Sequence, residues 1–368
     1  MLAGLRERAK AEGLWAPHLP PDAGGTGEGF LAYAYLNEEI GRSMWAQYVF
    51  NCQAPDAGNA EILHQFGTPA QRDRWLRPLV AGEIRSCFAM TEPEVSGADP
   101  TGLRTTAVRQ GDDWVLDGHK WFCSGAEGAA FAIVVAVTAP QAPPHRRMSL
   151  LLVPAGTPGF ELVRAIPVLG HRGRGWTTHC ELTFDRVRVP LADTVGAPGD
   201  GFRIAQRRLG PGRIHHVMRW LGQMQRAFEL LCAYALRREA FGGPLADKQT
   251  VQTWIADSAA EIQACRLLTL DAAARIDRGE EARLQISLVK FHAAGVLHDV
   301  VDRAVQVHGA LGLSDQTPLA AMYRQARAAR LYDGPDEVHR MVVSRHVLAA
   351  FRAGGAWDFA AGGPAGPA

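Results

Sequence analysis

The chain has 368 residues, 47% of them hydrophobic, with 39 Lys and Arg against 38 Asp and Glu, a formal net charge of +1. A chain of this length and composition can bury a large core without disulfides or metals, and it is longer than one ordinary domain. The near-neutral charge argues against the strong global field with which proteins hold nucleic acid or an anionic membrane.

The first part of the chain, residues 1–85, has the composition of a helical domain. Helix-forming stretches run from Leu31 to Ile40 and from Asn59 to Phe66, and a shorter one runs from Trp75 to Val80. Gly82 follows directly and is expected to stop the last of these helices.

The second part, residues 86–198, changes to the short β-rich runs that are typical of strands. Gly, Pro and Asp turn signals separate these runs, which favours an antiparallel β barrel or sandwich. The expected strands are Trp114–Leu116, Phe131–Val137, Ser149–Val153, Phe160–Val163 and Cys180–Phe184.

The third part, residues 199–352, is helical again. Apolar residues recur every three or four positions from Ile214 to Ala235, which predicts one long amphipathic helix that begins after the loop Gly210-Pro211-Gly212. Further helices are expected over Val251–Leu270, Ile286–Val307, Leu319–Leu331 and Glu337–Phe351. The Gly-, Ala- and Pro-rich tail, residues 353–368, is expected to be disordered.

The six cysteines are scattered and show no Cys-x-x-Cys spacing, which argues against a zinc site and against a secreted disulfide scaffold. Residues 1–10 are charged and lack an apolar signal core, and the longest apolar run, Ala129–Val137, is too short to span a bilayer. We therefore expect no metal, no membrane contact and a soluble reducing compartment, the bacterial cytoplasm.

Three segments are candidate sites. Gly25-Thr26-Gly27-Glu28-Gly29 looks like a dinucleotide loop, but no strand precedes it, so we interpret it as a flexible loop. In Cys87–Asp99, small residues allow close approach to a planar ring or phosphate, although a loop entering the β domain explains the same pattern. The aromatic pair in Gly118–Gly125 is by itself explained by core packing.

Five motifs in order along the chain resemble the acyl-CoA dehydrogenase family, and the resemblance covers essentially all of residues 1–352. They are Thr91-Glu92-Pro93, the Trp121 strand, Arg238 to Gly242, Gln306 to Gly309, and Tyr332-Asp333-Gly334, where the family has Tyr-Glu-Gly-Thr. The segments Asn51–Asp56, Leu209–His216 and Asp333–Glu337 are similar to the family-member 10 and 11 branch, here expected without the kinase-like domain of its animal members. The resemblance implies an α+β, mostly α fold: an N-terminal helical domain, a central antiparallel β domain and a C-terminal four-helix bundle.

The resemblance also implies FAD as cofactor. Residues with an implied flavin contact are Met90, Thr91, Trp121, Cys123 and Ser124, followed by Arg238, Phe241, Gln306 and Gly309 on the pyrophosphate and adenine side. Thr91 would hydrogen-bond the ring edge, and Cys123 or Ser124 would lie near flavin N5, where a thiol would be a weak donor. The second group would reach FAD held mainly by a neighbouring subunit, which implies a homodimer or homotetramer.

By the same resemblance, Asp333 would remove the α-proton of an acyl-CoA while the β-hydride passes to flavin N5. The carbonyl would be polarised by the N–H of Asp333 and by a ribityl hydroxyl of FAD, and Asp99, Arg213 and Gly334 would contact the substrate. Substrate binding would raise the pKa of Asp333 toward working pH. The adjacent His215 and His216 point in different directions on a helix, so we expect structural roles for both. We expect the same of the helix-start cluster Asp336, Glu337 and His339.

The family usually has Glu where this chain has Asp333, although members of the branch also carry Asp. Nitroalkane oxidases share the fold and use Asp, so they are the alternative function, together with a flavin-binding relative that does not turn over. An electron-transferring flavoprotein is the implied electron acceptor. The sequence leaves open the length, branching and hydroxylation of the acyl chain.

Overall fold

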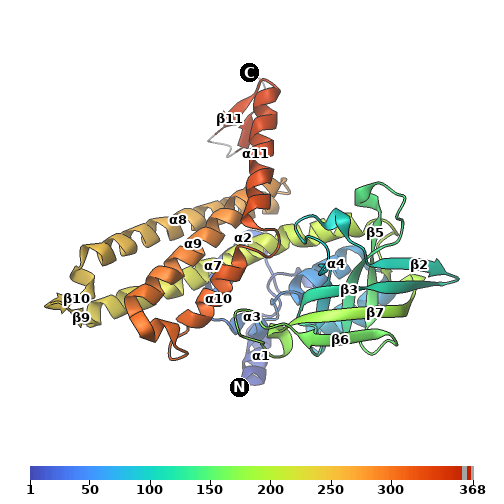
Figure 1. The fold of residues 1–368 in the computed structure, drawn as a ribbon, viewed down its shortest axis with the longest axis horizontal. Coiled ribbons are helices and arrows are strands. Elements are labelled where there is room, and N and C mark those ends of the chain that lie inside the picture. Colours follow the sequence, from blue (N-terminus) through green and yellow to red (C-terminus); the bar gives the residue numbers. More distant parts are fainter. Residues whose placement is uncertain (359–362, 366–368) are drawn as a thin grey trace. The chain divides into compact units, whose positions relative to one another are not determined.

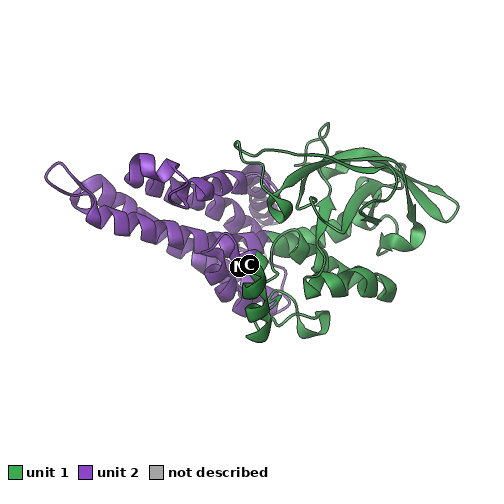
Figure 2. Cartoon of the chain, turned by 90° about the horizontal axis from the view of Figure 1, so that it is seen from below, with its two compact units in different colours: residues 1–27, 48–212 green, residues 28–47, 213–368 purple. Residues whose placement is uncertain are grey.

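The computed structural model describes residues 1–358 and 363–365. It contains two compact units, residues 1–27 with 48–212 (unit 1) and residues 28–47 with 213–368 (unit 2), shown in Figure 2. The expected division of the chain at residues 85 and 198 stays a prediction. The expected fold class is confirmed, since helices precede and follow a central sheet (Figure 1).

Helices form over the three predicted stretches, with Trp75 and Leu76 in a π-helical turn, and also over residues 2–11 and 46–49, where the sequence analysis predicted none. Their bounds are α1 Leu2–Ala11, α2 Phe30–Gly41, α3 Ala46–Val49, α4 Asp56–Phe66, α5 Pro69–Gln71 and α6 Arg77–Ala81. A π-helical turn, Arg72–Leu76, joins α5 to α6. Thr68 and Gln71 form a capping box at the start of α5. Gly82 follows α6 with a left-handed φ of 76°, as its stop signal predicts.

An eight-stranded sheet occupies the middle of the sequence, in the order β6-β7-β3-β2-β4-β5-β8, with β1 beside β4. Its strands are β1 Ser86–Ala89, β2 Thr106–Gln110, β3 Asp113–Ser124, β4 Phe131–Val137, β5 Met148–Pro154, β6 Phe160–Ala165, β7 His179–Pro190 and β8 Thr194–Val195. The expectation of a purely antiparallel sheet is wrong, because β1–β4 and β2–β4 are parallel pairs. These pairs join segments separated by long connections, whereas hairpin-like neighbours such as β2–β3 are antiparallel.

Strand β4 is buried along its whole length, because both faces of the sheet pack against apolar side chains there. Phe131, Ile133 and Val135 belong to the core that includes residues of α4 and α6. Ala132 and Val134 belong to a second core with residues of β3 and β7. The two-residue period of a strand explains this alternation, and burial on both faces explains why the sequence shows a continuous apolar run.

The second half of the chain is helical. The bounds are α7 Gly201–Arg237, α8 Gln249–Asp277, α9 Arg283–His308, α10 Leu319–Ala329 and α11 Asp336–Arg352, and α8, α10 and α11 all pack against α9. The prediction that the first helix begins after Gly212 is wrong, because α7 continues through Pro211. Proline removes one N–H donor, but the turns on both sides continue the helix despite that loss.

Helix α2 approaches α7 very closely at two glycines. A Cβ on Gly41 would lie 2.3 Å from the Arg219 carbonyl oxygen, and one on Gly222 would lie 2.0 Å from the Glu38 carbonyl oxygen. Only glycine permits this backbone contact, which holds the middle of α7 in place within unit 2.

Short strand pairs complete the described chain: β9 Glu239–Ala240 with β10 Gly243–Pro244, and β11 Ala356–Asp358 with β12 Gly363–Ala365. The second pair corrects the expectation of disorder for those parts of the tail, because backbone hydrogen bonds join the two strands. Residues 359–362 and 366–368 of the expected disordered tail lie outside the described residues. Within the described residues, every helix is too short or too polar to cross a membrane.

Candidate active site

The segment between α10 and α11 turns sharply at Asp333 and Gly334. Asp333 has a φ of 53° and Gly334 a φ of 96°, both in the left-handed region, where Gly costs nothing and Asp is tolerated. A Cβ on Gly334 would lie 2.9 Å from His339 Nε2, so a side chain would also be crowded there. The turn leaves the Asp333 side chain 22% exposed.

One face of α7 holds this turn. Arg213, His216 and Trp220 are spaced three and four residues apart, so they share a helix face. Arg213 Nε donates to the Asp333 carbonyl oxygen at 2.8 Å, and His216 Nε2 lies 3.0 Å from Asp333 Oδ2. Trp220 Nε1 donates to the Tyr332 hydroxyl at 2.9 Å. The structure thus brings together Arg213, Asp333 and Gly334, three residues that the sequence predicts as functional.

The adjacent residues His215 and His216 differ in what they contact. His215 stacks on Phe30 with ring centroids 5.2 Å apart and meets the Tyr33 ring edge-on, so its expected structural role is confirmed. His216 contacts the Asp333 carboxylate instead, so the structural role expected for it stays a prediction that depends on what Asp333 does. Its three-residue spacing from Arg213 was the sequence signal that could have identified it.

Lys290 is a buried lysine that the sequence analysis did not single out. Its ammonium donates to the Ala329 carbonyl oxygen at 3.0 Å and to the Gly334 carbonyl oxygen at 2.7 Å. Burial lowers the pKa of Lys290 to about 8, against the opposing attraction of Asp333 and Asp336. A single lysine inside the apolar pattern of α9 was the available signal, since an unneeded buried charge is costly.

The helix-start cluster supports the same turn. Arg330 Nε donates to Asp336 Oδ2 at 2.7 Å, and His339 Nε2 lies 3.2 Å from the Asp333 carbonyl oxygen. Burial lowers the pKa of His339 to about 4, with the Arg213 and Lys290 charges adding to the effect. Asp336 and His339 therefore have the structural roles expected of them.

Asp99, the remaining predicted substrate contact, lies in an exposed turn of unit 1. Its Oδ1 accepts hydrogen bonds from the Thr101 backbone N–H at 3.1 Å and from the Thr101 hydroxyl at 2.6 Å. These bonds describe a local helix cap, and the role of Asp99 toward an acyl chain stays a prediction.

In unit 1, the two predicted flavin motifs are joined to each other. The Trp121 N–H donates to the Thr91 carbonyl oxygen at 3.0 Å, and the Thr91 hydroxyl donates to the Trp121 carbonyl oxygen at 2.7 Å. The Lys120 ammonium donates to the Met90 carbonyl oxygen at 2.8 Å and forms a fully buried ion pair with Glu92. The pairing holds the segment that follows β1 against β3.

The two candidates for the flavin N5 contact are placed differently. Cys123 is completely buried in the core of the sheet, where burial raises the pKa of its thiol to about 12. Ser124 is half-buried, and its hydroxyl lies 2.8 Å from His179 Nδ1. The burial of Cys123 argues against its predicted cofactor contact and favours Ser124.

The unit 1 residues fit a planar ring system. Met90, Thr91 and Trp121 all stay partly exposed, although Ala89, Lys120 and Cys123 near them are buried. The ladder between β3 and β7 is irregular between Lys120 and Cys123, and Phe122 has a φ of 49°. Around this bulge, Trp121 and Ser124 are partly exposed and Phe122 is exposed, and a flavin ring needs such an accessible aromatic and polar surface.

The second group of predicted FAD residues lies at one end of unit 2. Tyr234 on α7 stacks on His308 of α9 with ring centroids 4.2 Å apart, so the segments with Arg238 and Gln306 lie side by side. Phe241, in the turn between β9 and β10, is 100% exposed with a φ of 51°. Gly309 ends α9 with a φ of 61°. An exposed Arg beside Gln suits the phosphates of a dinucleotide.

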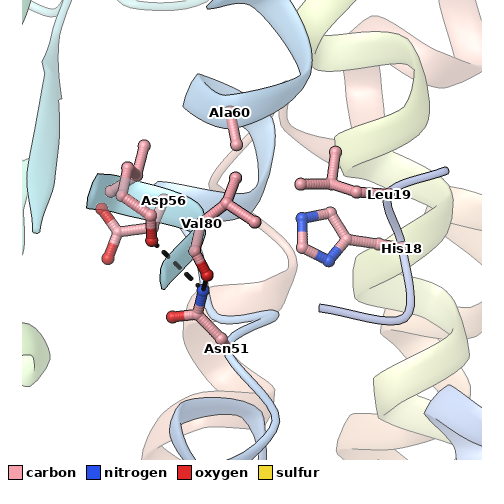
Figure 3. A pocket seen from close by; sticks show the side chains of 7 residues that line it. His18, Leu19, Asn51, Asp56, Ala60 and Val80 are labelled. Carbon is pink, nitrogen blue, oxygen red and sulfur yellow. Dashed lines mark hydrogen bonds between the residues drawn. The ribbon is translucent and has the colours of Figure 1, made fainter. Parts of the chain in front are cut away.

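Two hollows in unit 1 lie apart from the predicted site residues. The first is too narrow to admit a water molecule and is lined by His18, Leu19, Asn51, Asp56, Ala60, Leu79 and Val80. Figure 3 shows the Asn51 amide turned toward Val80, whose carbonyl oxygen accepts its hydrogen bond at 3.1 Å. The second, of about 270 Å³, is largely apolar and runs along β4 and β6. None of the described His, Cys, Asp and Glu side chains gather in threes as a metal site requires.

Comparison with known proteins identifies the family. Three family models match in order: the acyl-CoA dehydrogenase N-terminal domain over residues 3–83, the middle domain over 87–187 and the C-terminal domain over 199–348. Among curated proteins, the probable acyl-CoA dehydrogenase FadE2 of Mycobacterium tuberculosis is 48% identical over 94% of this chain and 84% of that protein. Human acyl-CoA dehydrogenase family member 11 is 41% identical over 92% of this chain, which spans only 44% of the human protein.

Comparison with solved structures identifies the same family. A candidate acyl-CoA dehydrogenase of Mycobacterium abscessus superposes with a TM-score of 0.93 and 44% identity, over 95% of this chain and 87% of that one. Butyryl-CoA dehydrogenase of Megasphaera elsdenii superposes with a TM-score of 0.83 and 30% identity, over 94% and 89%. The chain therefore belongs to the acyl-CoA dehydrogenase family, whose members are flavoprotein oxidoreductases that act on CH–CH donors.

Proposed function

We propose that this chain is an FAD-dependent acyl-CoA dehydrogenase that converts a fatty acyl-CoA to the trans-2-enoyl-CoA, with Asp333 as the α-proton base. The observation that carries the proposal is the left-handed turn at Asp333, held by Arg213 and His216 of α7 and by Lys290 of α9. The backbone of this turn is held from two helices, and the Asp333 carboxylate, which contacts His216, still keeps 22% of its side-chain surface exposed, as proton transfer requires.

FAD would be held by Met90, Thr91, Trp121 and Ser124 on the ring side and by Arg238, Phe241, Gln306 and Gly309 on the phosphate side. When bound, it supplies the two-electron oxidant that takes the β-hydrogen as hydride. The exposed position of Phe241 supports a binding site shared with a second copy of the chain, hence a homodimer or homotetramer.

Asp333 accepts the proton from the α-carbon as the C–H electron pair moves into the developing carbon–carbon double bond. The thioester carbonyl gathers negative charge in this step, and the Asp333 backbone N–H would stabilise it. Arg213 and His339 both contact the Asp333 carbonyl oxygen, so they hold the peptide unit of Asp333 and Gly334 in the turn. Gly334 permits the left-handed turn, and the absence of a side chain there avoids the His339 ring, which lies 2.9 Å from where a Cβ would be.

The nitroalkane-oxidase alternative uses the same residue type as base, so the identity of Asp333 does not separate the two reactions. They differ in what reduces the bound flavin under anaerobic conditions. We expect acyl-CoA thioesters to bleach the flavin absorbance and nitroethane to leave it unchanged. The reverse pattern would assign the chain to nitroalkane oxidation, and reduction by neither would indicate a flavin-binding protein without turnover.

Asp333→Asn tests the base, because it keeps the size of the side chain and the backbone N–H but removes the proton acceptor. Flavin content should stay normal, while the rate of flavin reduction by acyl-CoA falls by about 10²–10⁴-fold. Glu337→Gln, an exposed carboxylate on the first turn of α11, is the matched control and should be unaffected. Full activity of Asp333→Asn would place the base elsewhere.

Assays with the same protein can identify the preferred acyl chain and the physiological electron acceptor. A panel of acyl-CoA thioesters of different length, branching and hydroxylation should rank the substrates. An electron-transferring flavoprotein is the acceptor that we propose, to be compared with a dye acceptor in steady-state turnover.

A further inference from the structure

The imidazole of His216 lies between two groups of opposite charge. An Arg219 guanidinium nitrogen contacts Nδ1 of the ring, and Asp333 Oδ2 lies 3.0 Å from Nε2. The His216 side chain is only 11% exposed, and the ring of Tyr332 packs against it edge-on with centroids 4.8 Å apart. Trp220 stacks parallel to it at 6.1 Å.

This arrangement decides where the His216 ring carries its proton. A guanidinium only donates hydrogen bonds, so Nδ1 must present its lone pair to Arg219. A neutral imidazole with a lone pair on Nδ1 carries its hydrogen on Nε2, and that N–H faces a carboxylate that can only accept. Both contacts are satisfied by one tautomer, and the opposite tautomer would satisfy neither.

A doubly protonated ring would break the arrangement, because Nδ1–H would then face the Arg219 cation. The charged and titratable groups around the ring are Arg213 and Arg219 on α7, Tyr332 and Asp333 in the turn, and Lys290 on α9. Burial and then the Arg219 charge lower the pKa of His216 to about 4, while Asp333 opposes them. The ring is therefore neutral at neutral pH, and it has no lone pair turned toward Asp333 with which to act as a base itself.

We propose that His216 and Arg219 are positioning residues: Arg219 selects the Nε2–H tautomer of His216, which then holds Oδ2 of Asp333 in place for proton transfer. The proposal rests on the function proposed for Asp333. An aspartate is one methylene shorter than the glutamate usual in the family, so its carboxylate reaches less far and its orientation matters more. A hydrogen bond to one carboxylate oxygen restricts rotation of the side chain, as reaction at a fixed carbon atom requires.

The tautomer is measured without any turnover. In the flavin-loaded protein labelled with ¹⁵N-histidine, two-bond ¹H–¹⁵N spectra at pH 7 should show His216 with its proton on Nε2. Arg219→Leu should raise the pH at which the ring titrates, because the cation beside Nδ1 is gone. It should also let the Nδ1–H tautomer appear beside the Nε2–H tautomer that Asp333 still favours. Tyr332→Phe is the matched control, because Arg219 also interacts with the Tyr332 hydroxyl. A wild-type ring protonated on Nδ1, or one unchanged by Arg219→Leu, would overturn the proposal.

The effect on the base is measured by rapid flavin reduction with acyl-CoA. His216→Phe keeps the ring volume but removes the donor, and the reduction rate should fall about 10–100-fold as the carboxylate loses its orientation. The acidic limb of its pH profile should move to higher pH, since a hydrogen bond to the charged carboxylate is lost. His216→Gln can donate from its amide nitrogen and should stay within a few-fold of wild type.

The outcomes separate this proposal from the proposed function. A wild-type protein whose flavin is not reduced by acyl-CoA refutes the dehydrogenase reaction, while the tautomer measurement still decides the role of Arg219 and His216. An active wild type whose His216→Phe variant reacts at the same rate and with the same pH profile refutes the positioning role alone. Equal loss in His216→Phe and His216→Gln, without a pH shift, would mean that His216 is needed only for packing.

Discussion

The buried ion pair between Lys120 and Glu92 offers a sharp test of how the flavin-ring motifs are held. Lys120 Nζ lies 2.8 Å from Glu92 Oε1, and the side chains are 0% and 2% exposed. Glu92 also accepts hydrogen bonds from the backbone N–H groups of Arg104 and Thr105 at 2.7 and 2.9 Å. The Lys120 ammonium donates to the Met90 carbonyl oxygen as well. Replacing Lys120 therefore affects both partners and the segment that carries Thr91.

Lys120→Met keeps the length of the side chain and removes its charge. The Glu92 carboxylate is then left buried without its cation, and removing one partner of a buried pair costs about 3–5 kcal/mol. Its two backbone donors retain part of the stabilisation, so we expect the lower half of that range. The double variant Lys120→Met/Glu92→Gln removes both charges and should recover at least about 1 kcal/mol relative to the sum of the single changes.

Equilibrium urea unfolding, followed by tryptophan fluorescence, measures these free energies. Arg77→Met is the control, because its partner Asp73 and Arg77 itself are exposed, with side-chain exposures of 64% and 79%, and exposed pairs contribute about 0–1 kcal/mol. A Lys120→Met protein that unfolds within about 1 kcal/mol of wild type would show that the pair does not stabilise this part of unit 1. FAD retention should fall in the same variant, because the Met90–Thr91 segment loses its anchor.

Two further predictions concern stability. Burial raises the pKa of Glu61 to about 8, so its neutral form stabilises the fold below the unfolded value near 4.5, and that contribution is lost as the pH rises through 8. The free energy of unfolding of Glu61→Gln should therefore rise relative to that of wild type between pH 5 and pH 8, by up to about 1.4 kcal/mol per pH unit. The same difference between the two proteins at pH 5 and at pH 8 would contradict this prediction. Asp277 accepts hydrogen bonds from the backbone N–H groups of Phe30 and Leu31 at 2.6 and 2.7 Å. Asp277→Ala should therefore lower the free energy of unfolding in urea by about 0.5–2 kcal/mol, whereas Asp277→Asn should retain most of that stability.

Local patterns in the sequence were enough to predict most of the elements and part of the site. The apolar run Phe131–Val137 is strand β4 with the same bounds, and the helix predicted from Ile214 to Ala235 lies inside α7. Hydrophobic periodicity reports which faces of an element are buried, and that information is carried by residues close together in the chain. The family motifs also singled out Asp333 and Gly334, and the left-handed turn there suits both residue types, since Gly has no side chain and Asp tolerates that conformation.

Long-range packing decided the rest. Pro211 predicted a helix start, yet α7 passes through it, because the turns on both sides outweigh one lost hydrogen bond. His216 and Lys290 showed no motif, and each contacts the turn at Asp333 and Gly334 from a different helix, far away in sequence. Which side chain meets a carboxylate depends on how helices cross and on how closely glycines such as Gly222 allow them to approach. The sequence by itself therefore determined most of the elements and the family and singled out Asp333, whereas only the tertiary structure decided which groups surround that residue.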